Sequence, residues 1–473
     1  MSQGQSKMNI ECPFNLVDQK WIPILYQDGT VDRVGILRAL EDANRIRQIA
    51  ASNPMDRMAI LRFLLAVLYW CKGDPDSPPV SSLPAEWFSR LSDNRDCFNL
   101  LGAGKRFYQY KDNKNNDKKL SANYLMQEVP TGINMWHFRH STDGMDGLCP
   151  ACCAMGLLRL PLFATSGGRG KPPGVNAKPP TYVIPVGDSL AATLLLSWQK
   201  TDLLGKPFWE QPSSRLPNPV PLLTGLTWVA RRVWLDEPSE PRAACNSCGR
   251  LDQLVRLSVF APIGSQKTAA NEPARVWRDP HVIYDKRDKS LPAGDALGAS
   301  DAAAGQWAKI VAGMLGEEKT DHKAWVVGFA TVQNDKYLEA MEWHFPSLGS
   351  IGEAEALAAI EQWSKETRTS KLAPKCRPRS TPSSRKHVEI PPLVAAIRPH
   401  VEDRVSANVS ELLEGEDGAW QEAAAEYGPM MKVIARSLSP GFTTAALQRR
   451  RDIASVLPKM PQKARSGRKE EGK

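Results

Sequence analysis

Two pairs of cysteines constrain the fold of this 473-residue chain more than any other sequence feature. Cys149-Pro-Ala-Cys152 and Cys245-Asn-Ser-Cys248 each present two thiols from a single turn, with the spacing that suits a metal ion. Zinc prefers four soft ligands in a tetrahedron, so the pairs predict a structural Zn²⁺ site with Cys149, Cys152, Cys245 and Cys248 as ligands. Because about ninety residues separate the pairs, the site would join distant segments of one domain.

A redox dithiol and a set of unremarkable thiols are the alternatives to zinc. Cys149-Pro-Ala-Cys152 resembles a thioredoxin-like motif, but that motif needs a preceding strand, and Asp143 to Leu148 (DGMDGL) is not strand-like. The redox interpretation also leaves the second pair unexplained. His137 and His140 could compete as ligands, and Cys153 could replace Cys152. A closed site of four ligands would contribute stability and not catalysis.

Composition narrows the class of protein without deciding it. A chain of this length predicts two or more domains. Its 61 Lys and Arg against 52 Asp and Glu leave a net charge of +9. That charge is only weak evidence for a polyanionic partner, because it is spread over a long chain. The segment from Met1 to Pro13 lacks the apolar core of a signal peptide. The most apolar stretch, Ala59 to Cys71, contains Arg62 and is too short to span a bilayer. We therefore expect a cytoplasmic protein with no membrane partner.

The N-terminal part predicts short strands and one buried helix. Asp28-Gly29 is hairpin chemistry between a strand-like run ending near Leu25 and a second strand from Thr30 to Ile36. A helix is expected from about Met55, with Asn53 or Asp56 as its cap. Lys105 to Lys119 is interpreted as an exposed basic loop. Further β-rich runs lie at Thr181 to Val186, Gly225 to Val233, His281 to Tyr284 and Ala324 to Val332.

The fold class expected is α+β. Residues 1–345 would form an irregular mixed α/β domain that carries the zinc site, and a helical bundle would follow at residues 346–458. A basic, proline-containing loop at residues 371–387 would interrupt the bundle. Residues 459–473 would form a disordered tail.

No familiar catalytic motif is present in the sequence. His-Glu-x-x-His, a Walker A loop, a convincing Gly-x-Ser-x-Gly and an EF-hand loop are all missing. His281 beside Asp279 is the best pair for general-base chemistry, although a structural turn is favoured there. The chain is therefore expected not to be an enzyme. Two alternatives stay open: a zinc-stapled nucleic-acid-processing enzyme with a dispersed active site, and a zinc-bearing scaffold that binds only protein.

An ordered set of short motifs resembles the CasA family, the large subunits of the type I-E CRISPR surveillance complex (Cascade). The resemblance covers the chain to about residue 345 and is looser beyond it. The motifs are Phe14-Asn15-Leu16, Trp21-Ile22-Pro23, His137 to Ser141 (HFRHS), Leu148 to Cys152 (LCPAC), Ser166 to Lys171 (SGGRGK), Cys245 to Cys248 and Trp277 to His281 (WRDPH).

The resemblance implies an antiviral defence protein that reads a short motif, the PAM, in duplex target DNA and helps open the duplex. Further partners would be the guide RNA 5′ handle, other Cascade subunits and a helicase-nuclease effector. The DNA contacts would come from a Gly-rich loop, a lysine after the second cysteine pair and a wedge. These residues are Gly167, Gly168, Arg169, Gly170 and Lys171, then Lys267, then Gln333 and Asn334.

The chemistry of these residues agrees with those roles but does not require them. Glycines let backbone amides approach a phosphate, and amide side chains can replace lost base hydrogen bonds. Phe138 could stack on an RNA base while His140 donates a hydrogen bond. The alternatives are a solvent loop, a surface lysine, a hairpin turn, and a packed aromatic beside a hydrogen-bonded histidine.

Overall fold

The computed structural model describes residues 14–76, 83–110, 119–126, 147–163, 174–176, 180–213, 215–229, 231–262, 277–282, 323–332 and 337–345. The chain divides into two compact units, residues 1–292 with 327–341 and residues 293–326 with 342–473. The predicted helical bundle at 346–458, basic loop at 371–387 and tail at 459–473 lie outside the described residues and stay predictions.

The described fold opens with a small antiparallel sheet. Strands β1 (Ile22–Tyr26) and β2 (Val31–Val34) pair directly, and β3 (Ile46–Ile49) pairs with the other edge of β1 after helix α1 (Ile36–Glu41). Gly29 adopts the left-handed φ of 87° that the tight turn requires. The hairpin predicted around Asp28-Gly29 is therefore confirmed.

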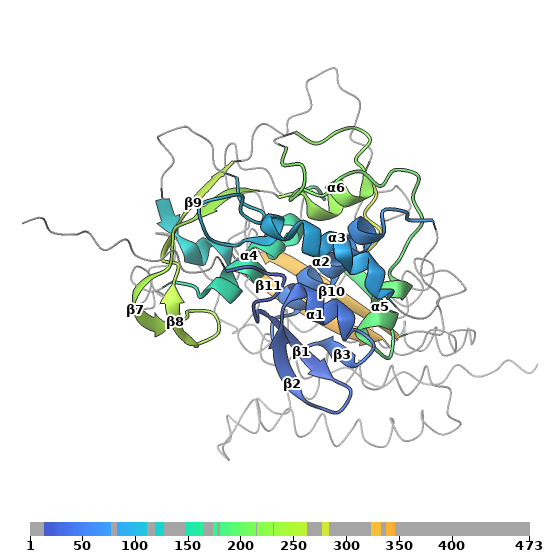
Figure 1. The fold of residues 1–473 in the computed structure, drawn as a ribbon, viewed down its shortest axis with the longest axis horizontal. Coiled ribbons are helices and arrows are strands. Elements are labelled where there is room, and N and C mark those ends of the chain that lie inside the picture. Colours follow the sequence, from blue (N-terminus) through green and yellow to red (C-terminus); the bar gives the residue numbers. More distant parts are fainter. Residues whose placement is uncertain are drawn as a thin grey trace, which may run out of the picture. The chain divides into compact units, whose positions relative to one another are not determined.

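Helix α2 (Pro54–Lys72) is the centre of the core (Figure 1). The Asn53 side chain accepts a hydrogen bond from the Met55 amide at 2.9 Å, so Asn53, and not Asp56, is the cap of the two that the sequence offers. The helix is buried all round from Met58 to Cys71, which is typical of a helix inside a protein. It packs against α3 (Ser89–Asp93), α4 (Pro150–Phe163), α5 (Leu190–Leu196) and α6 (Leu222–Thr227). Across the described ranges, none of the helices combines the length and apolar character needed to cross a bilayer.

Three 3₁₀ turns complete the helical part of the described fold. They are η1 (Ala85–Phe88), η2 (Arg95–Phe98) and η3 (Ala122–Leu125). Gly156 of α4 faces Leu125 of η3 so closely that a Cβ would lie 2.7 Å from the Leu125 side chain. This contact holds η3 tightly against α4.

The remaining strands of the described ranges form three further sheets. Strand β9 (Leu257–Pro262) lies between β4 (Lys119–Ser121) and β6 (Arg231–Leu235), with both pairings antiparallel. Strands β7 (Ser239–Ala244) and β8 (Leu251–Leu254) form a separate two-stranded hairpin. The third sheet has the order β11-β10-β5, from β5 (Tyr182–Val186), β10 (Lys323–Val332) and β11 (Tyr337–Phe345).

Two sequence predictions in this region are wrong. The strand expected from Gly225 to Val233 begins only at Arg231, because its first residues complete α6. That short helix packs on an aromatic ring, since a Cβ on Gly225 would collide with Trp277. The loop expected at Lys105 to Lys119 is not wholly exposed either. Phe107 and Tyr108 are buried in an aromatic cluster with Phe63 of α2.

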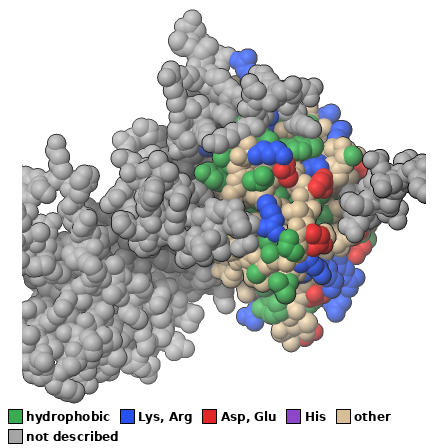
Figure 2. Space-filling model, turned by 90° about the vertical axis from the view of Figure 1, so that its left-hand side faces the viewer, with side chains coloured by type: hydrophobic (Ala, Val, Ile, Leu, Met, Phe, Trp, Pro, Cys, Tyr) green, Lys and Arg blue, Asp and Glu red, His purple; other side chains and the backbone are tan. Residues whose placement is uncertain are grey.

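Charges on the surface are mixed in sign. On the face drawn in Figure 2, Lys and Arg side chains alternate with Asp and Glu. Several basic side chains in the described fold have acidic partners, as in the pairs Lys119–Asp236 at 2.7 Å and Lys20–Asp32 at 3.3 Å. The net charge of +9 does not gather into one uninterrupted basic patch on that face.

Candidate functional site

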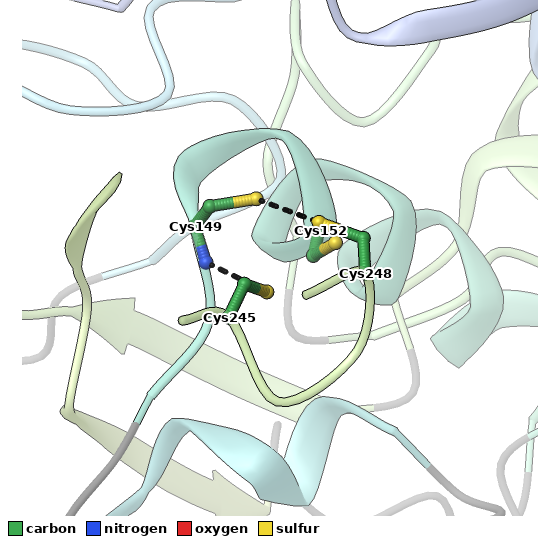
Figure 3. A group of neighbouring side chains, drawn as sticks. All are labelled: Cys149, Cys152, Cys245 and Cys248. Carbon is green, nitrogen blue, oxygen red and sulfur yellow. Dashed lines mark hydrogen bonds between the residues drawn. The ribbon is translucent and has the colours of Figure 1, made fainter. Parts of the chain in front are cut away.

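The four cysteines of the two Cys-x-x-Cys pairs come together at one place (Figure 3). Their sulfur atoms all lie within 4.8 Å of one another. Cys149 stands directly before α4 and Cys152 lies in its first turn. Cys245 and Cys248 occupy the turn that joins β7 to β8. The prediction that the two pairs meet is therefore confirmed.

The β7–β8 turn has the backbone of a metal-binding knuckle. The amide of Cys245 donates to the Arg250 carbonyl at 2.8 Å, and the amide of Gly249 donates to the Cys245 carbonyl at 2.8 Å. Gly249 adopts a φ of 72°, a left-handed conformation that favours glycine. The glycine after the second cysteine is thus what lets the chain turn back and direct both thiols to one side.

Backbone pairing brings the other half of the site to this hairpin. Leu148 and Val255 exchange hydrogen bonds of 3.0 and 2.9 Å, and the Asn246 amide donates to the Gly147 carbonyl at 3.1 Å. A Cβ on Gly147 would collide with the Val255 carbonyl. The segment before α4 therefore lies against the hairpin only because residue 147 has no side chain.

The cluster has dimensions that fit a tetrahedral metal ion. The Sγ atoms of Cys149 and Cys248 are 3.7 Å apart. Four thiolates about 2.3 Å from zinc would lie roughly 3.8 Å from each other. The separation is far too long for a disulfide, whose S–S bond is about 2.05 Å, and all four cysteines are free thiols. The amide of Cys149 also donates to Cys245 Sγ at 3.2 Å, which favours the thiolate form of that sulfur.

Hydrogen bonds between the thiols shift their pKa values in opposite directions. Hydrogen bonds from Cys149 and Cys152 lower the pKa of Cys245, and a bond from Cys152 is the main reason that the pKa of Cys248 falls to about 6. Hydrogen bonds to its three neighbours raise the pKa of Cys152. The bond to Cys152 lowers the pKa of Cys149, but the bond to Cys245 and burial together raise it to about 12. The hydrogen bonds within the cluster thus favour the thiolate form of Cys245 and Cys248, and thiolates are the form in which cysteines bind a metal ion.

Cys153 lies outside the cluster, so it does not replace Cys152. Its thiol is buried and lies 3.8 Å from the Leu148 carbonyl. Burial raises its pKa well above the ordinary value. The other ligand candidates, His137 and His140, lie outside the described residues.

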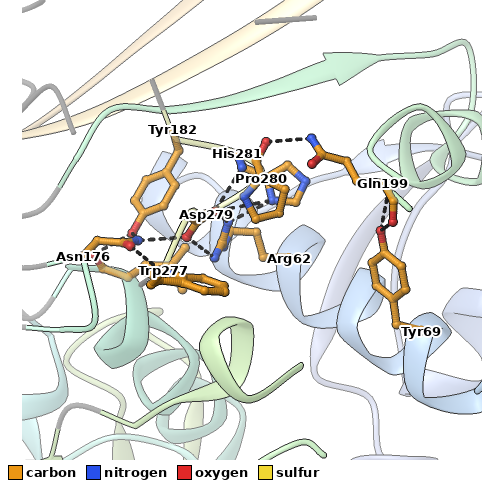
Figure 4. Close-up of polar contacts among 10 residues, drawn as sticks. Arg62, Tyr69, Asn176, Tyr182, Gln199, Trp277, Asp279, Pro280 and His281 are labelled. Carbon is orange, nitrogen blue, oxygen red and sulfur yellow. Dashed lines mark hydrogen bonds and ion pairs between the residues drawn. The ribbon is translucent and has the colours of Figure 1, made fainter. Parts of the chain in front are cut away.

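A second buried polar centre surrounds Arg62 of α2 (Figure 4). The guanidinium donates to both carboxylate oxygens of Asp279, at 2.6 and 2.7 Å, and lies 2.9 Å from His281 Nδ1. Asn176 donates to Asp279 at 2.8 Å, and Trp277 donates to Asn176 at 2.7 Å. Arg62 also lies over the ring of Tyr182, 5.1 Å from its centroid.

The surroundings of Asp279 and His281 are those of a structural turn. The two side chains are 0% and 2% exposed. Burial alone would raise the pKa of Asp279, but the charge and hydrogen bonds of Arg62 outweigh it, and the pKa is lowered. The His281 amide donates to the Asp279 carboxylate at 3.0 Å and closes the turn. The structure thus supports the structural role predicted for this pair over general-base chemistry.

Sequence reasoning did not find the partners of these buried charges. Arg62 is a residue whose sequence context indicates such a partner, because a charge inside an apolar helix needs a buried group of opposite charge. The same reasoning applies to Arg159 of α4, which forms a bidentate pair with Asp56 at the start of α2, at 2.7 Å through Nη2. Nothing in the sequence marks Asn176, since its contacts are to residues distant in the chain.

The predicted nucleic-acid contacts lie outside the described residues. For DNA these are Gly167, Gly168, Arg169, Gly170, Lys171, Lys267, Gln333 and Asn334, and for RNA they are Phe138 and His140. The described fold contains the residues at which several of these segments leave and return. Residues 147–149 follow the RNA segment, Gly174 follows the Gly-rich segment, and Trp277 follows the segment that holds Lys267.

Comparison with known proteins places the chain among CRISPR-associated proteins. The family profile of CRISPR-associated protein Cse1 matches residues 15–373. The CRISPR-associated protein CasA/Cse1 of Thermus thermophilus is 30% identical over 253 residues, which are 47% of this chain and 49% of the relative. The aligned chain thus spans about half the length of that relative.

Solved structures share the fold over nearly the whole chain. The crystal structure of Thermus thermophilus CasA matches with a TM-score of 0.62 and 21% identity, over 94% of this chain and 99% of that one. Thermobifida fusca Cse1 matches at 0.61 and 18%, over 94% and 98%. A chain of a CRISPR RNA-guided surveillance complex matches at 0.60 and 15%, also over 94% and 98%.

Proposed function

This chain belongs to the family of CRISPR-associated protein Cse1, and from that premise we propose that it is the large subunit of a CRISPR RNA-guided DNA surveillance complex. The match of the Cse1 family profile to residues 15–373 is the observation that carries the proposal. The fold shared with a chain of a CRISPR RNA-guided surveillance complex supports it. Its partners would be other Cascade subunits, the guide RNA 5′ handle and double-stranded target DNA.

The work of the subunit would be recognition and opening of the target duplex. Residues Gly167 to Lys171 would approach the DNA backbone through their amides and charges, Lys267 would enter the minor groove, and Gln333 with Asn334 would separate the first base pair. Phe138 and His140 would hold the guide RNA handle. The opened complex would then recruit a helicase-nuclease.

The cysteine cluster would hold one structural Zn²⁺ through Cys149, Cys152, Cys245 and Cys248. Four sulfurs within 4.8 Å of one another, three of them on buried residues, fit a closed site with no position for substrate. The ion would join the start of α4 to the β7–β8 hairpin. It would thereby keep residue 147, where the predicted RNA segment returns, beside the hairpin.

A binding role agrees with the chemistry of the described residues. The Asp279–His281 pair is buried and bonded to Arg62, so it is not available to activate water. We therefore propose a non-enzymatic subunit that leaves DNA cleavage to its effector.

Co-purification tests the proposed function. The tagged full chain is expressed with candidate partner subunits and guide RNA, and the isolated complex is tested on a labelled duplex that carries a guide-matched target. We expect a ribonucleoprotein that binds the duplex and does not cut it, with or without divalent metal. Cleavage by the purified chain alone would contradict the proposal and favour a nucleic-acid-processing enzyme. Retention of partner subunits without binding of RNA or duplex would favour a scaffold that binds only protein.

The assigned contacts have their own test. Gly168→Asp or Gln333→Ala should weaken duplex binding while thermal unfolding stays unchanged. The control for both variants is Leu251→Ser, at a residue of the β7–β8 hairpin that is 72% exposed. If the two variants bind as tightly as this control, the assigned residues are wrong.

A further inference from the structure

The buried network around Arg62 connects the bases of two segments that are far apart in the chain. One segment, residues 164–173, leaves α4 after Phe163 and returns at Gly174. The other, residues 263–276, leaves β9 after Pro262 and returns at Trp277. The bond from Trp277 Nε1 to Asn176 Oδ1, 2.7 Å long, joins the two return points directly (Figure 4).

Asn176 is the junction, because all of its side-chain polar groups are engaged. Its oxygen accepts from Trp277, and its nitrogen donates to Asp279 at 2.8 Å and lies 3.4 Å from the Tyr182 hydroxyl. A donor on one side and a carboxylate on the other leave one orientation for the amide. Asn176 therefore holds the relative position of its neighbours and does not merely fill space.

Helix α2 anchors this junction at two places. Arg62 binds Asp279, and Tyr69, seven residues later on the same helix face, donates to the Gln199 carbonyl at 2.8 Å. The Gln199 side chain in turn donates to the Pro280 carbonyl at 3.1 Å. The turn at residues 277–281 is thus attached to α2, a helix that is buried all round from Met58 to Cys71.

The end of α4, where the first segment begins, also contacts the residues at which that segment returns. The Tyr182 hydroxyl donates to the Leu162 carbonyl at 2.9 Å, in the last turn of α4. A Cβ on Gly174 would lie 2.7 Å from the Pro161 carbonyl oxygen, so the returning chain runs directly against that helix end. Leu162 and Asn176, the described residues on the two sides of residues 164–173, therefore belong to the same network.

We propose that Asn176, Trp277 and Asp279, anchored by Arg62, are positioning residues: they fix the points at which the Gly-rich segment and the Lys267 segment return to the described fold, and DNA binding by both segments depends on those points. This inference rests on the proposed function, because it takes Arg169, Lys171 and Lys267 as DNA contacts. Two contacts that are held in register bind as a unit, whereas loosely connected ones must be ordered on each binding event.

The consequence is that the network affects the number of cationic contacts with DNA and not only stability. Each lost cationic contact, at a phosphate or in the minor groove, lowers the slope of log affinity against log salt by about 1, because fewer counterions are displaced from the DNA. Lys267→Ala should remove about one unit of slope. Trp277→Phe keeps an aromatic ring but breaks the bond between the segments, so it should reduce the contribution of both. Its slope should fall by more than one unit and its affinity by about tenfold, which corresponds to a loss of about 1.4 kcal/mol.

The experiment measures binding of a fluorescein-labelled duplex by the full chain in its assembled complex, at several salt concentrations. The variants are Trp277→Phe, Asn176→Ala, Lys171→Ala, Lys267→Ala and the double variant of Trp277→Phe with Lys267→Ala. Ser189→Ala is the matched control, because it removes the cap of α5, a hydrogen bond of 3.1 Å, without touching the network. We expect the control to keep the salt slope and affinity, and Lys267→Ala to cost much less affinity in the Trp277→Phe background than alone.

The outcomes separate this inference from the proposed function. If the parent complex binds DNA and Lys267→Ala weakens it, but Trp277→Phe keeps the parent slope, the positioning role is wrong and the function stands. If Trp277→Phe and Ser189→Ala weaken binding equally with unchanged slopes, the network is only structural and the inference is overturned. If neither Lys267→Ala nor Lys171→Ala affects binding, both the inference and its premise fail. If Asn176→Ala does not fold, the salt slope and affinity of Trp277→Phe alone decide whether the positioning role is correct.

Discussion

The cysteine cluster and the Arg62 network tie distant segments together in opposite ways. The cluster joins Cys149 to Cys245, 96 residues apart, through thiols that carry like charges once ionised. The network joins Arg62 to Asp279, 217 residues apart, through charges that neutralise each other. In the proposed zinc site an added cation would hold the four sulfurs of the first connection together, whereas the second connection is complete within the chain.

This difference means that the two connections should respond to different treatments. A metal site contributes stability only while the metal is bound. A buried ion pair contributes little net stability but costs much when one partner is removed. Chelation should therefore affect only the first region, and substitution of a single charged residue should affect only the second.

The largest effect is expected on removing the metal or a ligand. Zinc binding supplies about 10–16 kcal/mol in small zinc domains, and most of β7 is exposed and buries little apolar surface. Cys245→Ser should therefore unfold the β7–β8 hairpin and sharply reduce bound zinc. Thermal unfolding with and without a zinc chelator, together with hydrogen exchange across residues 239–254, measures this.

Cys97→Ser is the matched control, because Cys97 is a free thiol outside the cluster. It should keep its zinc and the stability of the parent chain. An equal loss of stability in both variants would contradict the proposed metal site, because the four cysteines would then contribute no more than any packed thiol.

The next largest effect is expected at the ion pair. Asp279→Asn leaves Arg62 buried and only partly compensated, which should cost about 3–5 kcal/mol. Urea unfolding measures the loss, and the loss should be the same with and without chelator. The double variant of Arg62→Met with Asp279→Asn should recover part of it. Dependence of the Asp279→Asn effect on metal would mean that the two regions are one unit.

Low pH should weaken the ion pair between Arg62 and Asp279. Because the folded-state pKa of Asp279 lies below the ordinary 3.8, its charge contributes stability above about pH 4 that is lost as the pH falls through the lowered value. Unfolding free energies of the parent chain and of Asp279→Asn should therefore converge below that pH. A constant difference between them down to about pH 2 would show that the charge of Asp279 is not what stabilises the turn.

The smallest effect is expected from a single hydrogen bond within the network. Trp277→Phe leaves the Asn176 oxygen without this donor, at a cost of about 1–2 kcal/mol. Chelation should not change that value. Urea unfolding of Trp277→Phe and of Trp277→Phe with Asp279→Asn measures it, and the two losses should not be additive because the residues share Asn176.

The same contrast explains what could be predicted from the sequence. The cysteine pairs are short motifs whose chemistry requires a partner, so their meeting could be foreseen. Asp28-Gly29 and Asn53 act on nearby residues, so the turn is predicted at its position and Asn53 is one of the two predicted caps. The partner of Arg62 could not be found, because any of many buried carboxylates can neutralise an arginine and no spacing identifies the right one.

Local composition misled where tertiary packing decided. Lys105 to Lys119 is basic and polar, yet Phe107 and Tyr108 turn inward because an aromatic cluster around Phe63 receives them. The run from Gly225 to Val233 has strand-like residues, but Trp277 packs on Gly225 and the preceding leucines complete a helix. In both cases the deciding contact comes from a distant part of the chain.

The central claim is that four thiolates from the two pairs bind one structural zinc ion. X-ray absorption at the zinc edge of the purified full chain tests it most directly, with metal content measured on the same sample. The account predicts about one zinc per chain and a single shell of four sulfur ligands at about 2.3 Å. A folded chain with no zinc, or zinc with nitrogen or oxygen ligands in its shell, would contradict it.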